Sequence, residues 1–280
     1  MSDDKERDFR YLWDLMDDEH EQSASLAMAE LLRTGPPDLL NERLCEFQET
    51  RNPRLRRRVH QLQSAIGARF TRSLLADDLR SGKLSLLDGA IRLHLCWFDN
   101  DRYENVWSQW DDLRDELYDA RPGNIAEFGE FMVAQAFNAP NSRSELEPEY
   151  YCIGCVLDDM PGSDLILSII AAQLTVDTPL KLRLIRSGMD FGIMDSRGNK
   201  LFPGDNWRLA PAGRGDRPAP VRDAQALRMI ASSLFFCAVS TDSFRYLYTF
   251  GSALAAAAGR GFPDFLPYPY DMKDPEKQKF

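Results

Sequence analysis

The sequence predicts an α+β protein that is mostly helical and carries one short antiparallel sheet. Apolar residues recur three and four positions apart through residues 8–75, 84–138 and 222–258, which is the spacing of amphipathic helices. Convincing alternation of apolar and polar residues, the strand pattern, is confined to residues 182–207. A chain of 280 residues with 44% hydrophobic residues is also long enough to bury a sizeable core.

The first predicted segment, residues 1–82, is helical throughout. Gly35-Pro36-Pro37 and Asn52-Pro53 interrupt it, as expected where helices end and start. The stretch LMDDEHEQSASLAMAELLRTGPPDLLNERLCEFQETRNPRLRRRVHQLQSAI resembles a pair of HEAT-type repeats, in which stacked helices share one core. The basic run Arg54–Arg58 is interpreted as a solvated helix face.

The second predicted segment, residues 83–210, begins with more helices. One of them carries a stripe of large apolar residues, which at helical spacing predicts buried core rather than a ligand wall. The stripe consists of Tyr103, Val106, Trp107, Trp110, Leu113 and Leu117.

A turn at Pro161-Gly162 then precedes a strongly apolar helix, predicted from Asp164 to Leu174. Residues 182–207 follow as two short strands joined by a turn at Asp195–Gly198. Helices are predicted again in the third segment, 221–262, and an extended, proline-rich tail in 263–280.

Composition narrows the class of function. The net charge of −10 argues against binding to nucleic acid, whose phosphates would be repelled. The N-terminus has no apolar run, and no stretch approaches the roughly 18 apolar residues of a membrane span. Five cysteines, an odd number, do not predict a disulfide framework. We therefore expect a cytoplasmic protein with reduced thiols and no cofactor.

The order of pieces in residues 84–207 resembles the SirB-type branch of the transglutaminase-like superfamily. The resemblance is carried by LHLCWFDNDRYENVWSQWDDLRDEL, by CIGCVLDDMPG, by the strand entry Thr178-Pro179-Leu180 and by Leu201–Asn206. It implies a small papain-like core, with helical repeats before it and a helical segment after it.

The resemblance also implies a catalytic cysteine at the start of the buried helix and a histidine on the neighbouring strand. An aspartate on the strand after that would orient the histidine. Ile166 falls at the cysteine position, Gly188 to Asp190 at the histidine position, and Phe202 at the aspartate position. Asp164 adds a negative charge where a thiolate would otherwise be stabilised. We therefore expect no catalytic residue at these positions. Asp190 is expected to lie beside a catalytic site that has lost its function, either paired to Arg183 or Arg186 or exposed at a strand edge. The alternative for Asp190 is a general base.

Other residues offer competing chemistry. Cys152-Ile-Gly-Cys155 has the spacing of redox and zinc motifs, but without a second pair we interpret both as small buried residues. No metal site is predicted, and acids such as Asp195 and Asp205 are interpreted as turn residues rather than cation ligands. Ser163 is predicted to cap the buried helix. Ser168, one turn inside that helix, is predicted to bond its own backbone.

The predicted function is a catalytically inactive binding or scaffolding module whose partner is a protein or peptide. The competing hypothesis is a thiol-dependent hydrolase or acyl transferase. Its nucleophile would be Cys152 or Cys155, with His94 brought near by folding.

Overall fold

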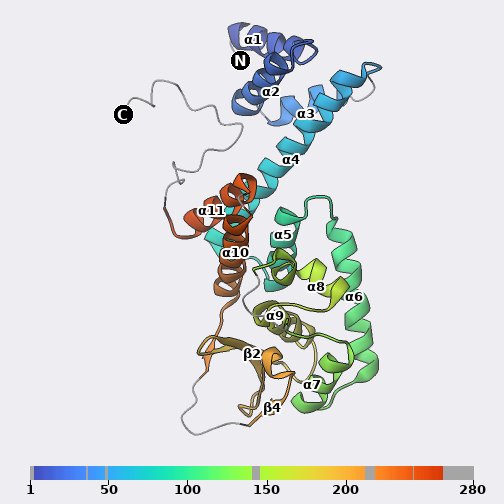
Figure 1. Cartoon of the computed structure of the whole chain (residues 1–280), viewed down its shortest axis with the longest axis vertical. Coiled ribbons are helices and arrows are strands. Elements are labelled where there is room, and N and C mark those ends of the chain that lie inside the picture. The colour runs from blue at the N-terminus through green and yellow to red at the C-terminus, as the bar shows by residue number, and fades with distance from the viewer. Residues whose placement is uncertain are drawn as a thin grey trace. The chain divides into compact units, whose positions relative to one another are not determined.

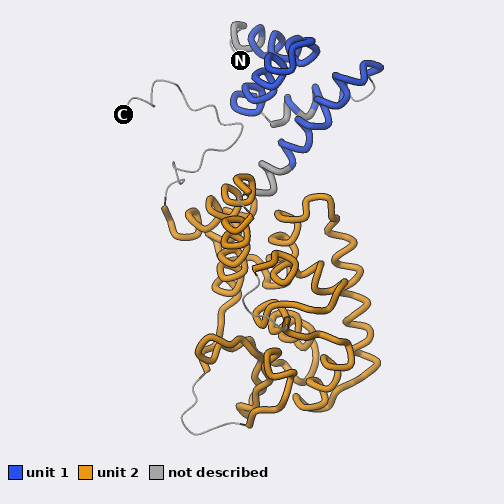
Figure 2. The backbone as a smooth tube through the Cα atoms, in the orientation of Figure 1, with its two compact units in different colours: residues 1–73, 265–280 blue, residues 74–264 orange. Residues whose placement is uncertain are grey.

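The computed structural model describes residues 3–35, 37–47, 50–140, 146–211, 218–241 and 243–260. The chain forms two compact units (Figure 2): unit 1, whose described residues lie within 1–73, and unit 2, residues 74–264. The division falls inside one long helix, whereas the sequence suggested a boundary at 82/83. The predicted tail, 263–280, lies outside the described residues.

The described residues of unit 1 form four helices around an apolar cluster of their own. They are α1 (Asp3–Leu15), α2 (Glu21–Thr34), α3 (Pro37–Phe47) and α4 (Pro53–Ser81), the last of which continues into unit 2. Trp13 lies in the cluster and stacks on Phe47, with ring centroids 5.4 Å apart. Leu31, Leu44 and Val59 are fully buried beside it.

The interpretation of Arg54–Arg58 as a solvated face is wrong at Arg58. Its side chain is completely buried, whereas Arg56 and Arg57 are exposed. One Arg58 Nη donates to the carbonyls of Met16 and Asp18, 2.7 Å from each, and the other donates to Glu21. Because backbone carbonyls from the turn after α1 accept these bonds, the guanidinium can lie inside the unit.

Two of the helices in the first part of unit 2, α5 and α7, begin at side-chain caps. Ser85 accepts from the backbone N–H of Asp88, and Asn124 accepts from those of Ala126 and Glu127. The helices are α5 (Leu86–Trp97), α6 (Tyr103–Ala120), α7 (Ile125–Ala134), the short 3₁₀ turn η1 (Pro148–Tyr151) and α8 (Ile153–Asp159). The predicted aromatic stripe on α6 is core, with four members buried and Tyr103 and Trp107 partly buried against them.

Helix α9 (Asp164–Leu174) has the predicted bounds and lies at the centre of unit 2. Nine of its eleven residues are buried, which requires neighbours on every side. The sheet contacts one side of α9, and α5, α8 and α10 contact the others (Figure 1). A helix that is apolar all round belongs in such a position.

The sheet is antiparallel, with strand order β4-β3-β2-β1-β5. The prediction of two strands in 182–207 is wrong in one respect, because the first of them is itself a hairpin. Ser187 pairs with Asp190, so Gly188 and Met189 form a two-residue loop. Gly188 has φ +62°, as expected for glycine at the first loop position of such a hairpin. The strands are β1 (Arg183–Ser187), β2 (Asp190–Met194), β3 (Lys200–Leu201), β4 (Leu209–Ala210) and β5 (Ala219–Pro220).

The turn predicted at Asp195–Gly198 is confirmed. It joins β2 to β3, and the Asp195 carboxylate accepts from the backbone N–H groups of Arg197 and Asn199. Asp195 is therefore a turn residue, as the sequence indicated.

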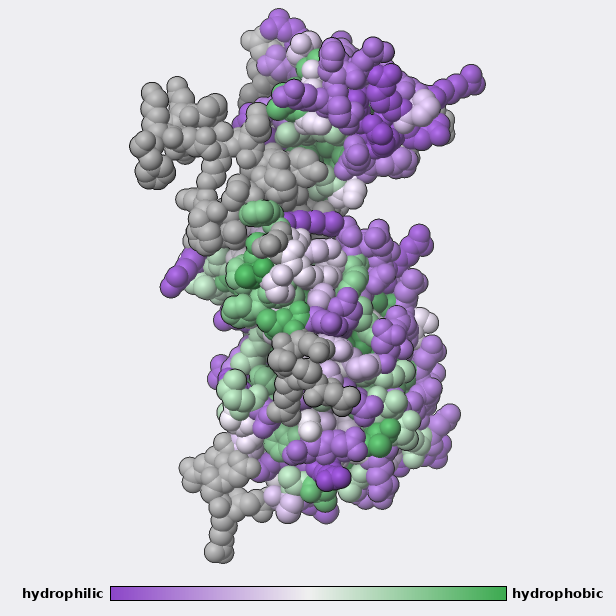
Figure 3. All heavy atoms as spheres, viewed as in Figure 1, coloured by the Kyte–Doolittle hydropathy of each residue, from purple (hydrophilic) through white to green (hydrophobic). Residues whose placement is uncertain are grey.

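The last two helices, α10 (Asp223–Ser240) and α11 (Phe244–Ala257), share the core of unit 2. Tyr246 of α11 stacks on Trp97 and donates its hydroxyl to the Trp97 carbonyl at 2.9 Å. Figure 3 shows hydrophobic residues gathered over α10 and α11 and hydrophilic residues along α6. Among the described residues, no helix is both long and apolar enough to cross a bilayer.

Candidate functional site

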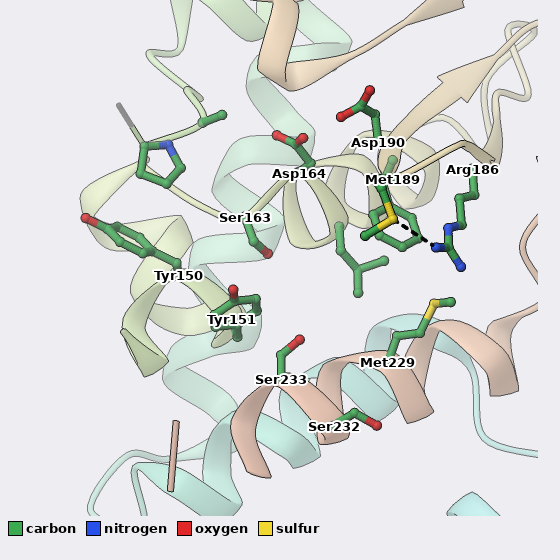
Figure 4. Close-up of a pocket in the computed structure, with 14 residues that line it drawn as sticks. Tyr150, Tyr151, Ser163, Asp164, Arg186, Met189, Asp190, Met229, Ser232 and Ser233 are labelled. Carbon is green, nitrogen blue, oxygen red and sulfur yellow. Dashed lines mark hydrogen bonds between the residues drawn. The ribbon is translucent and has the colours of Figure 1, made fainter. Parts of the chain in front are cut away.

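A pocket of about 490 Å³ opens at the N-terminus of α9. It is formed by η1, the start of α9, the β1–β2 hairpin and the middle of α10 (Figure 4), together with Ala139 and Pro140 from the segment after α7. Its volume lies in the usual range for ligand-binding clefts, about 300–1,000 Å³. None of the described residues that line it is a cysteine or a histidine.

The start of α9 supplies one side of this pocket. The Ser163 hydroxyl accepts from the backbone N–H of Ile166, which confirms the predicted cap. The backbone N–H of Ser163 donates to the carbonyl of Tyr150 at 2.9 Å, which fixes η1 beside the helix. Asp164 and Leu165 line the pocket, whereas Ile166 points into the core and is fully buried.

The β1–β2 hairpin supplies a second side. Met189, at its tip, is 82% exposed, although methionine side chains are usually buried. Arg186 is tied to the hairpin: Nε donates to the Gly188 carbonyl at 2.9 Å, and the guanidinium lies over the Phe191 ring. Its Nη contacts the Met189 sulfur at 3.7 Å (Figure 4). Asp190, the next residue of the hairpin, is partly exposed and lines the pocket.

Helix α10 and η1 complete the walls. Met229 and Ser233 of α10 point toward the hairpin across the pocket, and Tyr150 and Tyr151 come from η1 (Figure 4). Burial, with the nearby Cys237 and Asp164, raises the pKa of Tyr151, so its hydroxyl keeps its proton at neutral pH.

The structure brings together part of the predicted vestigial set. Asp164 and Asp190 line the same pocket, and Gly188 forms the loop next to Met189. Ile166 lies in the core and is fully buried, and Phe202, directly after β3, has its ring beside Gly192 of β2. The aromatic and methionine walls were not predicted, because they come from segments up to about eighty residues apart. The local signal that was missed is Gly188-Met189, a two-residue hairpin loop within alternating residues.

The competing hypothesis places the nucleophile at Cys152 or Cys155, beside His94. Gly154, between Cys152 and Cys155, lies against the His94 ring, so folding does bring this motif beside the histidine. Burial, with help from Glu149, raises the pKa of Cys155 to about 12, and burial also raises the pKa of Cys152 well above the usual value of a thiol. Both thiols are therefore protonated at neutral pH, whereas a nucleophilic cysteine needs the thiolate.

His94 is held as a neutral imidazole. Its side chain is 1% exposed, and Nε2 lies 2.9 Å from a carboxylate oxygen of Asp101, so Nε2 carries the proton. Nδ1 is buried and has no hydrogen-bond partner in the described part of the chain. Protonating Nδ1 would bury an unpaired N–H, so burial lowers the pKa of His94 although Asp101 raises it.

This histidine makes unit 2 sensitive to acid. Because the pKa of folded His94 is below the ordinary 6.5, the unfolded chain binds more protons, and stability is lost as pH falls below about 6.5. We expect His94→Gln to reduce the fall in melting temperature between pH 7.5 and pH 5.0, measured by circular dichroism.

The control for this measurement is His60→Gln. His60 is exposed and lies in unit 1, so its replacement should leave the pH profile of unit 2 unchanged. Equal acid sensitivity in the His94→Gln variant and the natural chain would contradict the assignment.

The sequence prediction for Ser168 is wrong. The Ser168 hydroxyl does not bond its own backbone; it is buried and has no partner among the described residues, because apolar side chains enclose α9. Within the same residues, no group of three or more His, Cys, Asp or Glu side chains is arranged to hold a metal ion.

Comparison with known proteins gives no family assignment. No family model, no curated protein and no solved structure matches this chain.

Proposed function

We propose that this chain is a catalytically inactive binding module that holds an extended segment of a partner protein in the pocket at the start of α9. The core would be transglutaminase-like, preceded by HEAT-like helices. The observation that carries the proposal is the pocket lining, which offers apolar side chains, hydroxyls and carboxylates but neither thiol nor imidazole among the described residues.

Physical chemistry supports binding rather than bond cleavage at this position. Ser163 already accepts from one of the backbone N–H groups at the start of α9, that of Ile166, and Asp164 places a negative charge in the first turn. An anionic nucleophile or oxyanion would be repelled there. Exposed Met189 and the facing Met229 instead provide adaptable apolar surface, which suits peptide side chains.

The thiol-dependent hydrolase is the second candidate, favoured by the contact between Gly154 and His94. The raised pKa values of both thiols weigh against it. Hydrolysis of an amide or ester by the purified protein, abolished by Cys155→Ser, would establish this alternative and overturn the binding proposal.

The proposal predicts that Met189→Ser weakens peptide binding about tenfold. Burying a methionine side chain contributes about 1.5–3 kcal/mol, and tenfold corresponds to about 1.4 kcal/mol. Peptides selected by phage display on the full chain would be measured by fluorescence anisotropy against the natural protein and the variant. Serine suits a hairpin loop, so the fold should be retained.

Val176→Ser is the matched control. Val176 is also exposed, at 52%, but follows the opposite end of α9, so its replacement should leave affinity unchanged. The proposal fails if no displayed peptide is enriched, or if Met189→Ser and Val176→Ser have equal effects.

A further inference from the structure

We infer that residues 261–272 of this chain, which we call the apolar segment, pack against an exposed apolar face of unit 2. The end of α10 and α11 form this face, the α10–α11 face, which carries Phe236, Val239 and Phe244. The apolar segment follows α11 directly and lies outside the described residues. Three observations support the contact: the exposure of the face, the way α11 ends, and the composition and length of the segment.

The α10–α11 face exposes large apolar side chains. Phe236 is 58% exposed, and Val239, three residues later, is exposed on the same side of α10. Phe244, 61% exposed, begins α11 directly after the turn, where the backbone N–H of Ser243 donates to the Ala238 carbonyl at 3.2 Å. Figure 3 shows hydrophobic residues gathered over both helices. A group of exposed apolar side chains marks a contact surface, whereas isolated ones do not.

Helix α11 is less enclosed than its composition favours. Ten of its fourteen residues are apolar or aromatic, but just three residues, Thr249, Phe250 and Ala253, are buried. A helix at a protein surface usually carries charged residues on its outer side. Helix α11 has one charged residue, Arg245. Its outer side therefore offers apolar surface that another segment can cover.

The end of α11 turns the chain away from the helix axis. Gly259 has φ +66°, and the backbone N–H of Arg260 donates to the Ala255 carbonyl at 2.9 Å. The backbone N–H of Gly259 donates to the Ala256 carbonyl at 3.0 Å. These bonds, with a left-handed glycine between them, form a Schellman motif, which ends a helix and redirects the chain.

The composition of the following chain changes at residue 273. Before that position its large apolar and aromatic residues are Phe262, Phe265, Leu266, Tyr268, Tyr270 and Met272. Five of the eight residues in 273–280 are charged. The part of the chain nearest to α11 is therefore the part that gains from covering an apolar face.

The length of the apolar segment matches the face. The prolines at positions 263, 267 and 269 favour a polyproline conformation, in which eight residues span about 25 Å. Helix α11, with fourteen residues, is about 21 Å long. Residues 261–268 are therefore long enough to run back along α11 and bring Tyr268 level with Phe244.

Covalent attachment favours the apolar segment over any other occupant of this face. A binding segment joined by a short connection has an effective concentration in the millimolar range. The prolines also restrict the unbound segment, so less conformational entropy is lost on binding. Even a contact that is weak between separate molecules is then formed most of the time.

Photocrosslinking of the full chain tests where the segment lies. With p-benzoylphenylalanine in place of Tyr268, we expect an intramolecular crosslink to peptides that contain Phe236 or Phe244. The same probe in place of Phe280, beyond the charged residues, is the matched control and should give at most one fifth of that yield. Crosslinks from position 268 that form chiefly to unit 1, to other elements of unit 2, or between two chains would overturn the inference.

Substitutions on the face test the other side of the contact. Phe236→Ser/Phe244→Ser should lower the intramolecular crosslink from position 268 at least fivefold. Val133→Ser/Leu209→Ser removes two exposed apolar side chains in α7 and β4 and should leave the yield unchanged. All four side chains are exposed, so both variants should retain the fold. Equal yields in the two variants would contradict the contact.

Substitutions in the apolar segment leave the sequence of every described element unchanged. Phe265→Ser/Leu266→Ser should accelerate hydrogen exchange of α11 about tenfold in the full chain, because the helix loses its cover. Lys277→Ser/Lys279→Ser, in the charged part, is the matched control and should leave the exchange of α11 as it is. Exchange of α11 that is the same with and without Phe265 and Leu266 would overturn the inference.

Discussion

Replacing Arg58 with methionine is expected to destabilise unit 1 by about 3 kcal/mol. Arg58 donates to two backbone carbonyls and to Glu21 from a completely buried position. Methionine fills a similar volume but donates nothing, so the carbonyls of Met16 and Asp18 lose hydrogen bonds from a charged donor. Such bonds contribute about 1.5–3 kcal/mol each.

Hydrogen exchange of the full chain, followed by mass spectrometry, can localise this effect. A loss of about 3 kcal/mol should accelerate exchange in the core of α1, α2 and α4 by about a hundredfold. Arg57→Met changes the neighbouring residue, whose side chain is 62% exposed, and should alter exchange little. Similar exchange in the two variants would show that Arg58 is not the link between α4 and the turn after α1.

Gly192→Ala is expected to destabilise unit 2 by about 3 kcal/mol or more. A Cβ at Gly192 would lie 2.4 Å from the Leu201 carbonyl oxygen and 2.6 Å from a ring carbon of Phe202. The first contact is with backbone of the paired strand, which cannot rotate away. Overpacking usually costs about 1–3 kcal/mol, and a clash with backbone in a central strand belongs at the upper end or beyond.

Thermal unfolding measures this change directly. We expect the melting temperature of unit 2 to fall by about 6 °C or more. Gly67→Ala makes the same chemical change in α4, where an added Cβ has nothing within 4 Å, and should be neutral or slightly stabilising. A melting temperature unchanged by Gly192→Ala would mean that β2 and β3 pair less closely than described.

Elements with a strong local pattern were predictable from the sequence. Helix α9 was predicted with its observed bounds, because a continuous apolar run follows a serine that can cap it. The hairpin within 182–194 was missed, because the alternation of apolar residues continues across it and only Gly188 marks the loop.

Features that depend on distant partners were not predictable. Arg58 looks like a solvated residue in its own segment, and only the carbonyls some forty residues earlier explain its burial. In the same way, Asp164 and Asp190 were singled out by the positions that the family resemblance implies, whereas Met229 joins them only because α10 packs beside α9.

The enclosure of α9 restricts how catalysis could arise in this protein. A cysteine introduced at position 166 would lie where water does not reach, and its anion would be disfavoured as it is for Cys152. Close packing alone therefore prevents the buried positions of α9 from carrying a reactive, ionised side chain. A reactive side chain could be introduced only at the rim of the pocket, where Asp164 and the hairpin tip, Met189, can be replaced without disturbing the core.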